Sequence, residues 1–248
     1  MTKTNTLVFI AGWGLGVAPL QALATALTHE LSSVLPDFVV QLQPLPDFTG
    51  QDTAAVIQQL NIELPNHCWL AGWSLGGMLA TAVAAQRQNT CAGLISVASN
   101  ACFVVKDTWL NAMPSSNFIA FHKRCQNNLT KGLKHFSQLC SQGATDPKVL
   151  SRELLTMALM PDLNVMLEGL NLLAKLDNRA AIAHFSSPQL HLFAADDALV
   201  PVTAAADYQI LNAQAAVEVL GQSHACVLAE PQLLAQRMAE FIVSHQNA

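Results

Sequence analysis

Short apolar runs alternate along the chain with longer segments in which apolar residues recur every three or four positions. The short runs predict buried strands, and the periodic segments predict helices. The expected strands are 6–11, 38–42, 67–71, 91–99, 189–194 and 215–220, and the expected helices are 19–35, 52–60, 75–86, 203–211 and 231–245. This alternation is typical of an α/β fold, a mostly parallel central sheet with helices on both faces.

The alternation is interrupted from 103 to 180. We find no strand pattern there, only helical pieces broken near Pro114, Gly132, Gly143, Pro147 and Pro161. We therefore expect a core formed by 1–102 and 181–248, with 103–180 inserted as a helical cap over the strand ends.

The composition fits one domain of this kind. The chain has 248 residues, 52% of them hydrophobic, which is ample for a sizeable core. A net charge of −5 argues against a nucleic-acid partner. No apolar run is long enough to cross a bilayer, and no long apolar signal region precedes the first strand. We expect a monomer in the cytoplasm with no membrane partner.

The cysteines and histidines show no pattern of a metal site. The six cysteines form no C-x-x-C pair, and the histidines show no H-E-x-x-H spacing. We expect buried, reduced thiols, no metal and no cofactor.

Charge separates the expected cap from the core. The cap holds nine of the twelve basic residues and six acidic ones, a net charge of +3, so the remainder carries −8. A cluster of one sign on an otherwise acidic protein favours an anionic partner, although a solvated helical face would look the same.

The sequence Gly72-Trp73-Ser74-Leu75-Gly76 joins the expected strand 67–71 to the expected helix 75–86. A serine on such a sharp turn is held clear of the sheet, and small neighbours are needed where strand and helix nearly collide. Ser74 is therefore the predicted nucleophile.

A serine nucleophile needs a base, and in this architecture the acid and then the histidine follow it along the chain. His224 fits because it follows the last expected strand and precedes the final helix. His184 and His191 are rivals, but one precedes a strand and the other lies within it. For the acid we choose Asp197, before Leu-Val-Pro, with the adjacent Asp196 in reserve.

Two N–H groups should hold the oxyanion of the tetrahedral intermediate. We expect them from Leu75, at the helix start, and from Trp13, in the glycine-rich loop after the first strand. Trp13 and Trp73 each neighbour a reacting group, so we also expect both to line the acyl pocket.

Together these motifs resemble the pimeloyl-acyl-carrier-protein methyl ester carboxylesterases of biotin synthesis, a family of α/β-hydrolases. The residues that carry the resemblance are the runs 12–15, 72–77, 97–99, 102–103, 197–201 and 224–225. The resemblance implies an α/β-hydrolase fold, a triad of Ser74, Asp197 and His224, and a four-helix cap. One departure is Ala11, where the family usually has a histidine.

The resemblance also implies a partner, an acyl carrier protein that presents a pimeloyl methyl ester. It places Phe136 over the acyl chain, and it assigns contacts with the acidic carrier to five cap residues: Lys131, Lys134, His135, Lys148 and Arg152. Two alternatives stay open: an esterase or thioesterase for small substrates without a protein partner, and a binding protein of the same fold without turnover.

Overall fold

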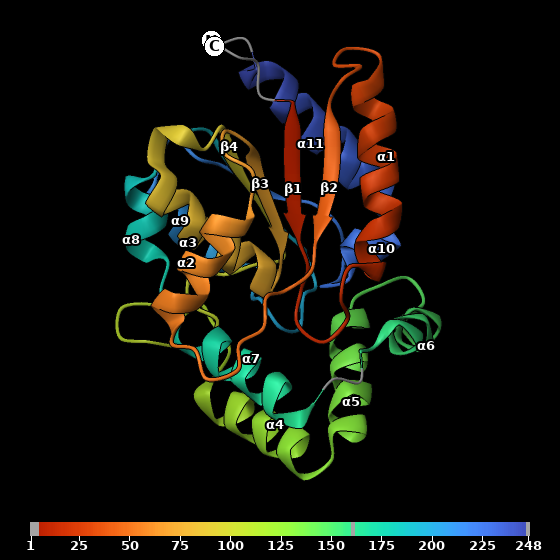
Figure 1. The fold of residues 1–248 in the computed structure, drawn as a ribbon. Helices are drawn as coiled ribbons and strands as arrows, with labels where there is room; N and C mark the ends of the chain where they lie inside the picture. Colours follow the sequence, from red (N-terminus) through yellow and green to blue (C-terminus); the bar gives the residue numbers. More distant parts are fainter. Residues whose placement is uncertain (1–4, 160–161, 247–248) are drawn as a thin grey trace.

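A parallel sheet of six strands forms the centre of the molecule (Figure 1). The structure is a computed structural model and describes residues 5–159 and 162–246. The strand order is β2-β1-β3-β4-β5-β6, and each neighbouring pair is parallel. The strands are β1 (Thr6–Ile10), β2 (Val39–Gln43), β3 (Trp69–Trp73), β4 (Gly93–Val97), β5 (Gln189–Phe193) and β6 (Ala216–Val219). The α/β prediction is confirmed.

Helices cover both faces of the sheet (Figure 1). On one face α1 (Gln21–Ser32) packs against α11 (Pro231–His245), and on the other lie α2 (Thr53–Glu63), α3 (Leu75–Arg87) and α8 (Arg179–His184). The helix α9 (Ala204–Leu211) contacts the last strand, and α10 (Cys226–Ala229) contacts α1 and α11. Every strand and helix expected from the apolar pattern is present, with ends that differ by a few residues.

Burial explains why the sequence signal was strong. All five residues of β3, β4 and β5 are buried, so these strands are mostly apolar, with Ser96, Gln189 and His191 as buried polar exceptions. The edge strands β2 and β6 are partly exposed and correspondingly more polar. The buried residues of the sheet and its helices form one continuous hydrophobic core.

The cap consists of four helices inserted between β4 and α8: α4 (Ser115–Asn127), α5 (Leu129–Ser141), α6 (Pro147–Met157) and α7 (Leu163–Lys175). In Figure 1 they lie beyond the end of the sheet toward which the strand arrows point. Side chains of Asn128, Asp146 and Asp162 cap the start of α5, α6 and α7.

One expected break in the cap is wrong. Gly132 lies inside α5, and the chain turns four residues earlier at Asn128. A Cβ at Gly132 would lie 2.5 Å from the Cys125 sulfur, so this glycine lets α4 and α5 approach closely. The break expected near Pro161 lies outside the described residues.

The cap is hydrogen-bonded to loops of the core. The carbonyl of Gly14 accepts the N–H of Leu159 at 2.9 Å, and the Trp13 indole donates to the carbonyl of Met166 at 2.9 Å. At the end of α5, the carbonyl of Cys140 accepts the N–H of Ala225 at 3.0 Å. The cap therefore contacts the loop after β1 and the loop that carries His224.

Membrane-spanning helices, metal-binding groups and disulfides are absent from the described residues. Within residues 5–159 and 162–246, no helix is long and apolar enough to cross a membrane, and no group of three or more His, Cys, Asp or Glu side chains could hold a metal ion. The six cysteines are buried and free.

Candidate active site

Ser74 occupies a strained turn between the last residue of β3 and the first residue of α3. Its φ of 55° and ψ of −121° are rarely adopted by a residue with a side chain. The turn is tight because the backbone at the start of α3 lies against the backbone at the ends of β3 and β1. A Cβ at Gly72 would collide with the backbone of Gly76, and a Cβ at Gly76 would collide with the carbonyls at the end of β1. The two glycines are therefore required by close backbone approach, as the sequence indicated.

His224 and Asp197 form a fully buried pair. The Nδ1 of His224 lies 2.8 Å from Oδ2 of Asp197, and neither side chain is exposed. The other carboxylate oxygen, Oδ1, accepts the N–H groups of Leu199 at 2.8 Å and Val200 at 3.0 Å. The carboxylate is thus fixed by three donors, and it selects the tautomer of His224 that carries a proton on Nδ1.

The second ring nitrogen of His224, Nε2, could act as a base. Nε2 is buried and has no hydrogen-bond partner among the described residues. A nitrogen with a free lone pair can accept a proton from a hydroxyl brought within reach, and such contacts are often long before substrate binds.

The rival residues lie in other settings. His191 is fully buried in β5, where Ser96 and Gln189 occupy its two nitrogens at 2.7 and 3.1 Å. His184 is exposed on α8 and bonds to the carbonyl of Ala180. Asp196 is exposed, and the hydrogen bond to His224 is made by its neighbour, Asp197.

The expected oxyanion donors are the N–H groups of Trp13 and Leu75. The first N–H groups of a helix have no acceptor within it, and Leu75 is the first residue of α3. Among the backbone hydrogen bonds of the described loops and turns, none uses the N–H of Trp13 or of Leu75.

A cavity of about 250 Å³ opens in front of Ser74. Its walls are mostly apolar and come from the cap helices and from Trp13, whose ring meets that of Phe136 edge-on at 5.0 Å. The polar side chains on its wall besides Ser74 are Asn117, Arg124 and His135. Burial and the nearby Arg124 lower the pKa of His135 from its ordinary value.

Trp73 lies elsewhere than we expected. It is fully buried, is not among the residues that line the cavity, and donates its indole N–H to the carbonyl of His224 at 2.8 Å. Trp13 and Phe136 line the cavity.

Sequence reasoning missed Arg124 and Asn117 as cavity residues. A signal was present, because Asn117, Phe121 and Arg124 are spaced to fall on one face of a helix, four and then three residues apart. Arg124 also lines a shallow groove on the outside of α4 and α5, together with Lys123 and Lys131.

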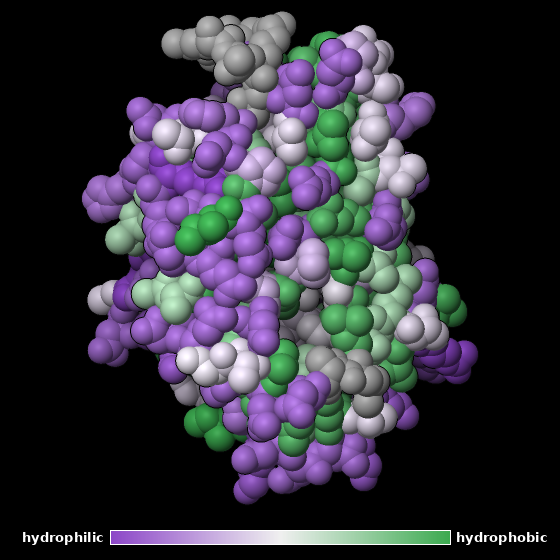
Figure 2. Space-filling model, in the orientation of Figure 1, coloured by the Kyte–Doolittle hydropathy of each residue, from purple (hydrophilic) through white to green (hydrophobic). Residues whose placement is uncertain are grey.

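The cap residues expected to bind a carrier do not all lie together. His135 faces the cavity, Lys131 and Lys134 are exposed on α5, and Lys148 and Arg152 are exposed on α6. None of these four cations forms an ion pair within the described residues. Figure 2 shows hydrophilic residues over the end of the cap formed by α4 and α5.

Comparison with known proteins agrees with this geometry. The model of the Alpha/beta hydrolase family matches residues 7–237. The biotin biosynthesis bifunctional protein BioHC of Cellvibrio japonicus is 36% identical over 244 residues, which are 95% of this chain and 47% of that protein. The pimeloyl-acyl-carrier-protein methyl ester esterase of Vibrio cholerae is 30% identical, with 95% of this chain and 93% of that protein covered.

Solved structures show the same fold at low identity. A bromoperoxidase from Bacillus anthracis superimposes with a TM-score of 0.81 at 14% identity, covering 96% of this chain and 92% of the other. An esterase from Exiguobacterium antarcticum gives a TM-score of 0.75 at 15% identity, covering 100% and 94%.

The length of the match differs among the relatives. The chain spans less than half of the bifunctional relatives, between 44% and 47%, and nearly all of the Vibrio cholerae esterase. The family match covers almost the whole chain, and the resemblance to the pimeloyl ester esterases seen in the sequence is confirmed. The chain belongs to the alpha/beta hydrolase family.

Proposed function

We propose that this chain is a serine carboxylesterase that hydrolyses the methyl ester of pimeloyl-acyl-carrier protein in biotin synthesis. The observation that carries the proposal is a serine on a strained turn at an apolar cavity, beneath a cap with unpaired basic residues. The buried His224–Asp197 pair and the names of the relatives support the same reaction.

In the first step Ser74 attacks the methyl ester carbonyl. His224 takes the serine proton on Nε2, and Asp197 stabilises the imidazolium that forms. The N–H groups of Trp13 and Leu75 bind the negative oxygen of the tetrahedral intermediate. His224 then returns the proton to the departing methoxide, and methanol leaves.

In the second step water replaces methanol. His224 removes a proton from the water as it attacks the acyl-serine, and the same two N–H groups bind the second tetrahedral oxyanion. Collapse of this intermediate transfers the proton from His224 to the Ser74 oxygen and frees the carboxyl end of the pimeloyl chain, which ionises to a carboxylate. The hydrolysis changes no oxidation state, so it needs no cofactor to supply or accept electrons.

The cavity suits the acyl chain of this substrate. Its apolar wall, with Phe136 and Trp13, can pack against methylene groups, and its polar side chains can meet the thioester and the first amide of the carrier's arm. We infer that the cap spares the thioester by geometry, admitting the distal ester to Ser74 while the thioester stays beyond Arg124.

The carrier would bind the outside of the cap. An acyl carrier protein is acidic and bears a phosphate on its arm, and lysine and arginine suit both. We assign this contact to Lys131, Lys134, Lys148 and Arg152, which are exposed and unpaired within the described chain, and to His135 at the cavity wall.

Charge reversal separates this proposal from its main rival, an esterase or thioesterase for small substrates. The variant combines Lys131→Glu, Lys148→Glu and Arg152→Glu and is assayed on the carrier-bound methyl ester and on a short soluble methyl ester. Loss confined to the carrier-bound ester supports the carrier function. If both esters are cleaved as by the unaltered protein, the rival is correct.

The nucleophile is tested directly. Ser74→Ala should lower turnover on the order of a millionfold, because triad members act as a unit. Retained hydrolysis in Ser74→Ala would refute the mechanism, and failure of Ser74 in the unaltered protein to react with a phosphonate would favour a binding protein without turnover.

A further inference from the structure

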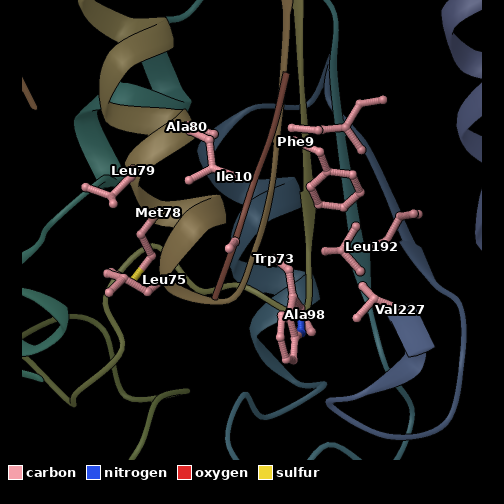
Figure 3. Packing of buried hydrophobic residues seen from close by; sticks show 14 of the residues in the cluster. Phe9, Ile10, Trp73, Leu75, Met78, Leu79, Ala80, Ala98, Leu192 and Val227 are labelled. Atoms are coloured by element: carbon pink, nitrogen blue, oxygen red, sulfur yellow. The ribbon is translucent and has the colours of Figure 1, made fainter. Parts of the chain in front are cut away.

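Trp73 connects the nucleophile turn to the loop that carries the histidine. It is the last residue of β3, directly before Ser74, and its side chain lies buried near the ends of the strands (Figure 3). Its indole nitrogen donates to the carbonyl of His224 at 2.8 Å. One side chain therefore links the backbone of the base to the residue adjacent to the nucleophile.

The same indole also contacts the loop after β1. A Cβ added at Gly12 would lie 2.8 Å from Cε3 of Trp73, so the main chain at Gly12 rests against the ring. The rings of Trp73 and His224 have centroids 5.7 Å apart. The indole thus packs between the loop that provides the Trp13 N–H and the loop that provides the imidazole.

Hydrogen bonds also hold the rest of the His224 loop, because the carbonyls of Gly221, Gln222 and Ser223 accept N–H groups at 2.8 to 3.0 Å. Asp197 holds the ring at Nδ1, and the carbonyl of Cys140 holds the next N–H, that of Ala225, at 3.0 Å. The indole of Trp73 is the donor to the carbonyl of His224 itself. These contacts together determine where Nε2 points.

We propose that Trp73 is a positioning residue, whose indole N–H sets the place of the His224 imidazole relative to Ser74. The inference rests on the proposed roles of Ser74 and His224 and extends them to a residue that does not line the cavity. A displacement of about 1 Å of a reacting group can cost on the order of a hundredfold in rate. Loss of the hydrogen bond should therefore lower the rate of the chemical step without weakening substrate binding.

The test uses two matched substitutions on one strand. Trp73→Phe keeps an aromatic ring but removes the N–H donor. Trp69→Phe makes the same change four residues earlier on β3, where the ring is equally buried and packs against Phe241 instead. Both variants are assayed for kcat and KM on a short soluble methyl ester, and for the rate at which a phosphonate inactivates Ser74.

We expect Trp73→Phe to lower kcat and the inactivation rate by about 10- to 100-fold, with KM within about twofold of its starting value. Trp69→Phe should keep both rates within about threefold at a comparable melting temperature. A rise in KM with kcat unchanged would show that Trp73 forms part of the acyl pocket, and unchanged kcat and KM would show that the hydrogen bond has no effect on catalysis; either result overturns the proposal.

A second variant guards against misfolding. If Trp73→Phe does not fold, the indole can be replaced by benzothiophene, which has nearly the same shape and carries sulfur in place of N–H. For this variant we again expect a lowered kcat with KM nearly unchanged, and an unchanged kcat would overturn the proposal. If the proposed function itself is wrong, the unaltered protein will show no hydrolysis and no phosphonate adduct, which is a different result from a lowered kcat.

Discussion

Oδ2 of Asp197 and Nδ1 of His224 lie 2.8 Å apart, and both side chains are fully buried. The opposite oxygen of the carboxylate is held by the N–H groups of Leu199 and Val200. The orientation of any amide placed at position 197 is therefore fixed in advance, because only its oxygen can accept from those two donors.

Asp197→Asn should act through this constraint. Its NH₂ would face Nδ1 of His224, which would then have to accept, and the ring proton would move to Nε2, where the base must be free. We expect kcat to fall about 10⁴-fold, with the fold retained. Asp196→Asn, at the neighbouring exposed position, should leave kcat nearly unchanged; an equal loss in both variants would contradict the assignment.

The backbone strain at Ser74 can be measured by comparing two inactive variants. Ser74→Gly relieves the cost of a φ of 55°, about 1–3 kcal/mol, at an entropic cost of about 0.5–1 kcal/mol in the unfolded chain. Ser74→Ala keeps the strain. Denaturant unfolding should show Ser74→Gly to be more stable by about 1 kcal/mol, and equal stabilities would mean that the turn is relaxed.

Gly72→Ala should be far more destabilising than its size suggests. The new Cβ would meet the backbone of Gly76, which cannot move without shifting α3, so we expect a loss of about 3 kcal/mol or more in the free energy of unfolding. Gly50→Ala is the control, because its φ is +67° but no atom lies within 4 Å of the new Cβ. Its cost should be only about 1 kcal/mol.

Salt should distinguish the two kinds of substrate. The cations on α5 and α6, which form no ion pair within the described residues, would attract an acidic carrier over a distance comparable to the Debye length, about 10 Å at 0.1 M salt. We expect kcat/KM for the carrier-bound ester to fall several-fold as the salt concentration rises toward about 0.5 M. The value for a short uncharged ester should not follow it; parallel curves would argue against electrostatic docking.

His191 should make stability depend on pH. Burial lowers its pKa from 6.5 to about 3, so between these values the unfolded chain binds one proton more than the folded protein. The free energy of unfolding should therefore decrease as the pH falls below 6.5, by up to about 1.4 kcal/mol per pH unit from this group. His191→Gln should flatten that slope in urea titrations, and a slope equal to that of the unaltered protein would contradict the role of this buried histidine.

The sheet and its helices could be predicted because their signals are local. A strand buried on both faces, such as β3 or β4, is apolar along nearly all of its length, so it can be recognised from its own residues. The residues of the candidate site followed from the same order, because each lies just after a strand. Asp197 and His224 were placed by their distance from β5 and β6.

The features that could not be predicted from the sequence, the roles of Gly132 and Trp73, depend on packing between segments that are distant along the chain. Gly132 looked like a helix end, since a glycine that permits two helices to cross reads the same as one that stops a helix. Trp73 looked like a pocket residue because it adjoins Ser74, but successive side chains on a strand point to opposite faces. Its partner, the carbonyl of His224, is 151 positions away and leaves no trace in the local pattern.

The hydrogen bond from the N–H of Ala225 to the last turn of α5 joins the cap to the loop that carries His224. A chimera with the cap of another hydrolase would need a backbone carbonyl in the position of the Cys140 carbonyl, within hydrogen-bond distance of the Ala225 N–H. The side chain at that position would not matter for this bond. Without it, the turn bearing His224 would lose an anchor even though every core residue was intact. A change in the cap that moves the Cys140 carbonyl would therefore alter both the substrates that the cavity admits and the rate at which they react.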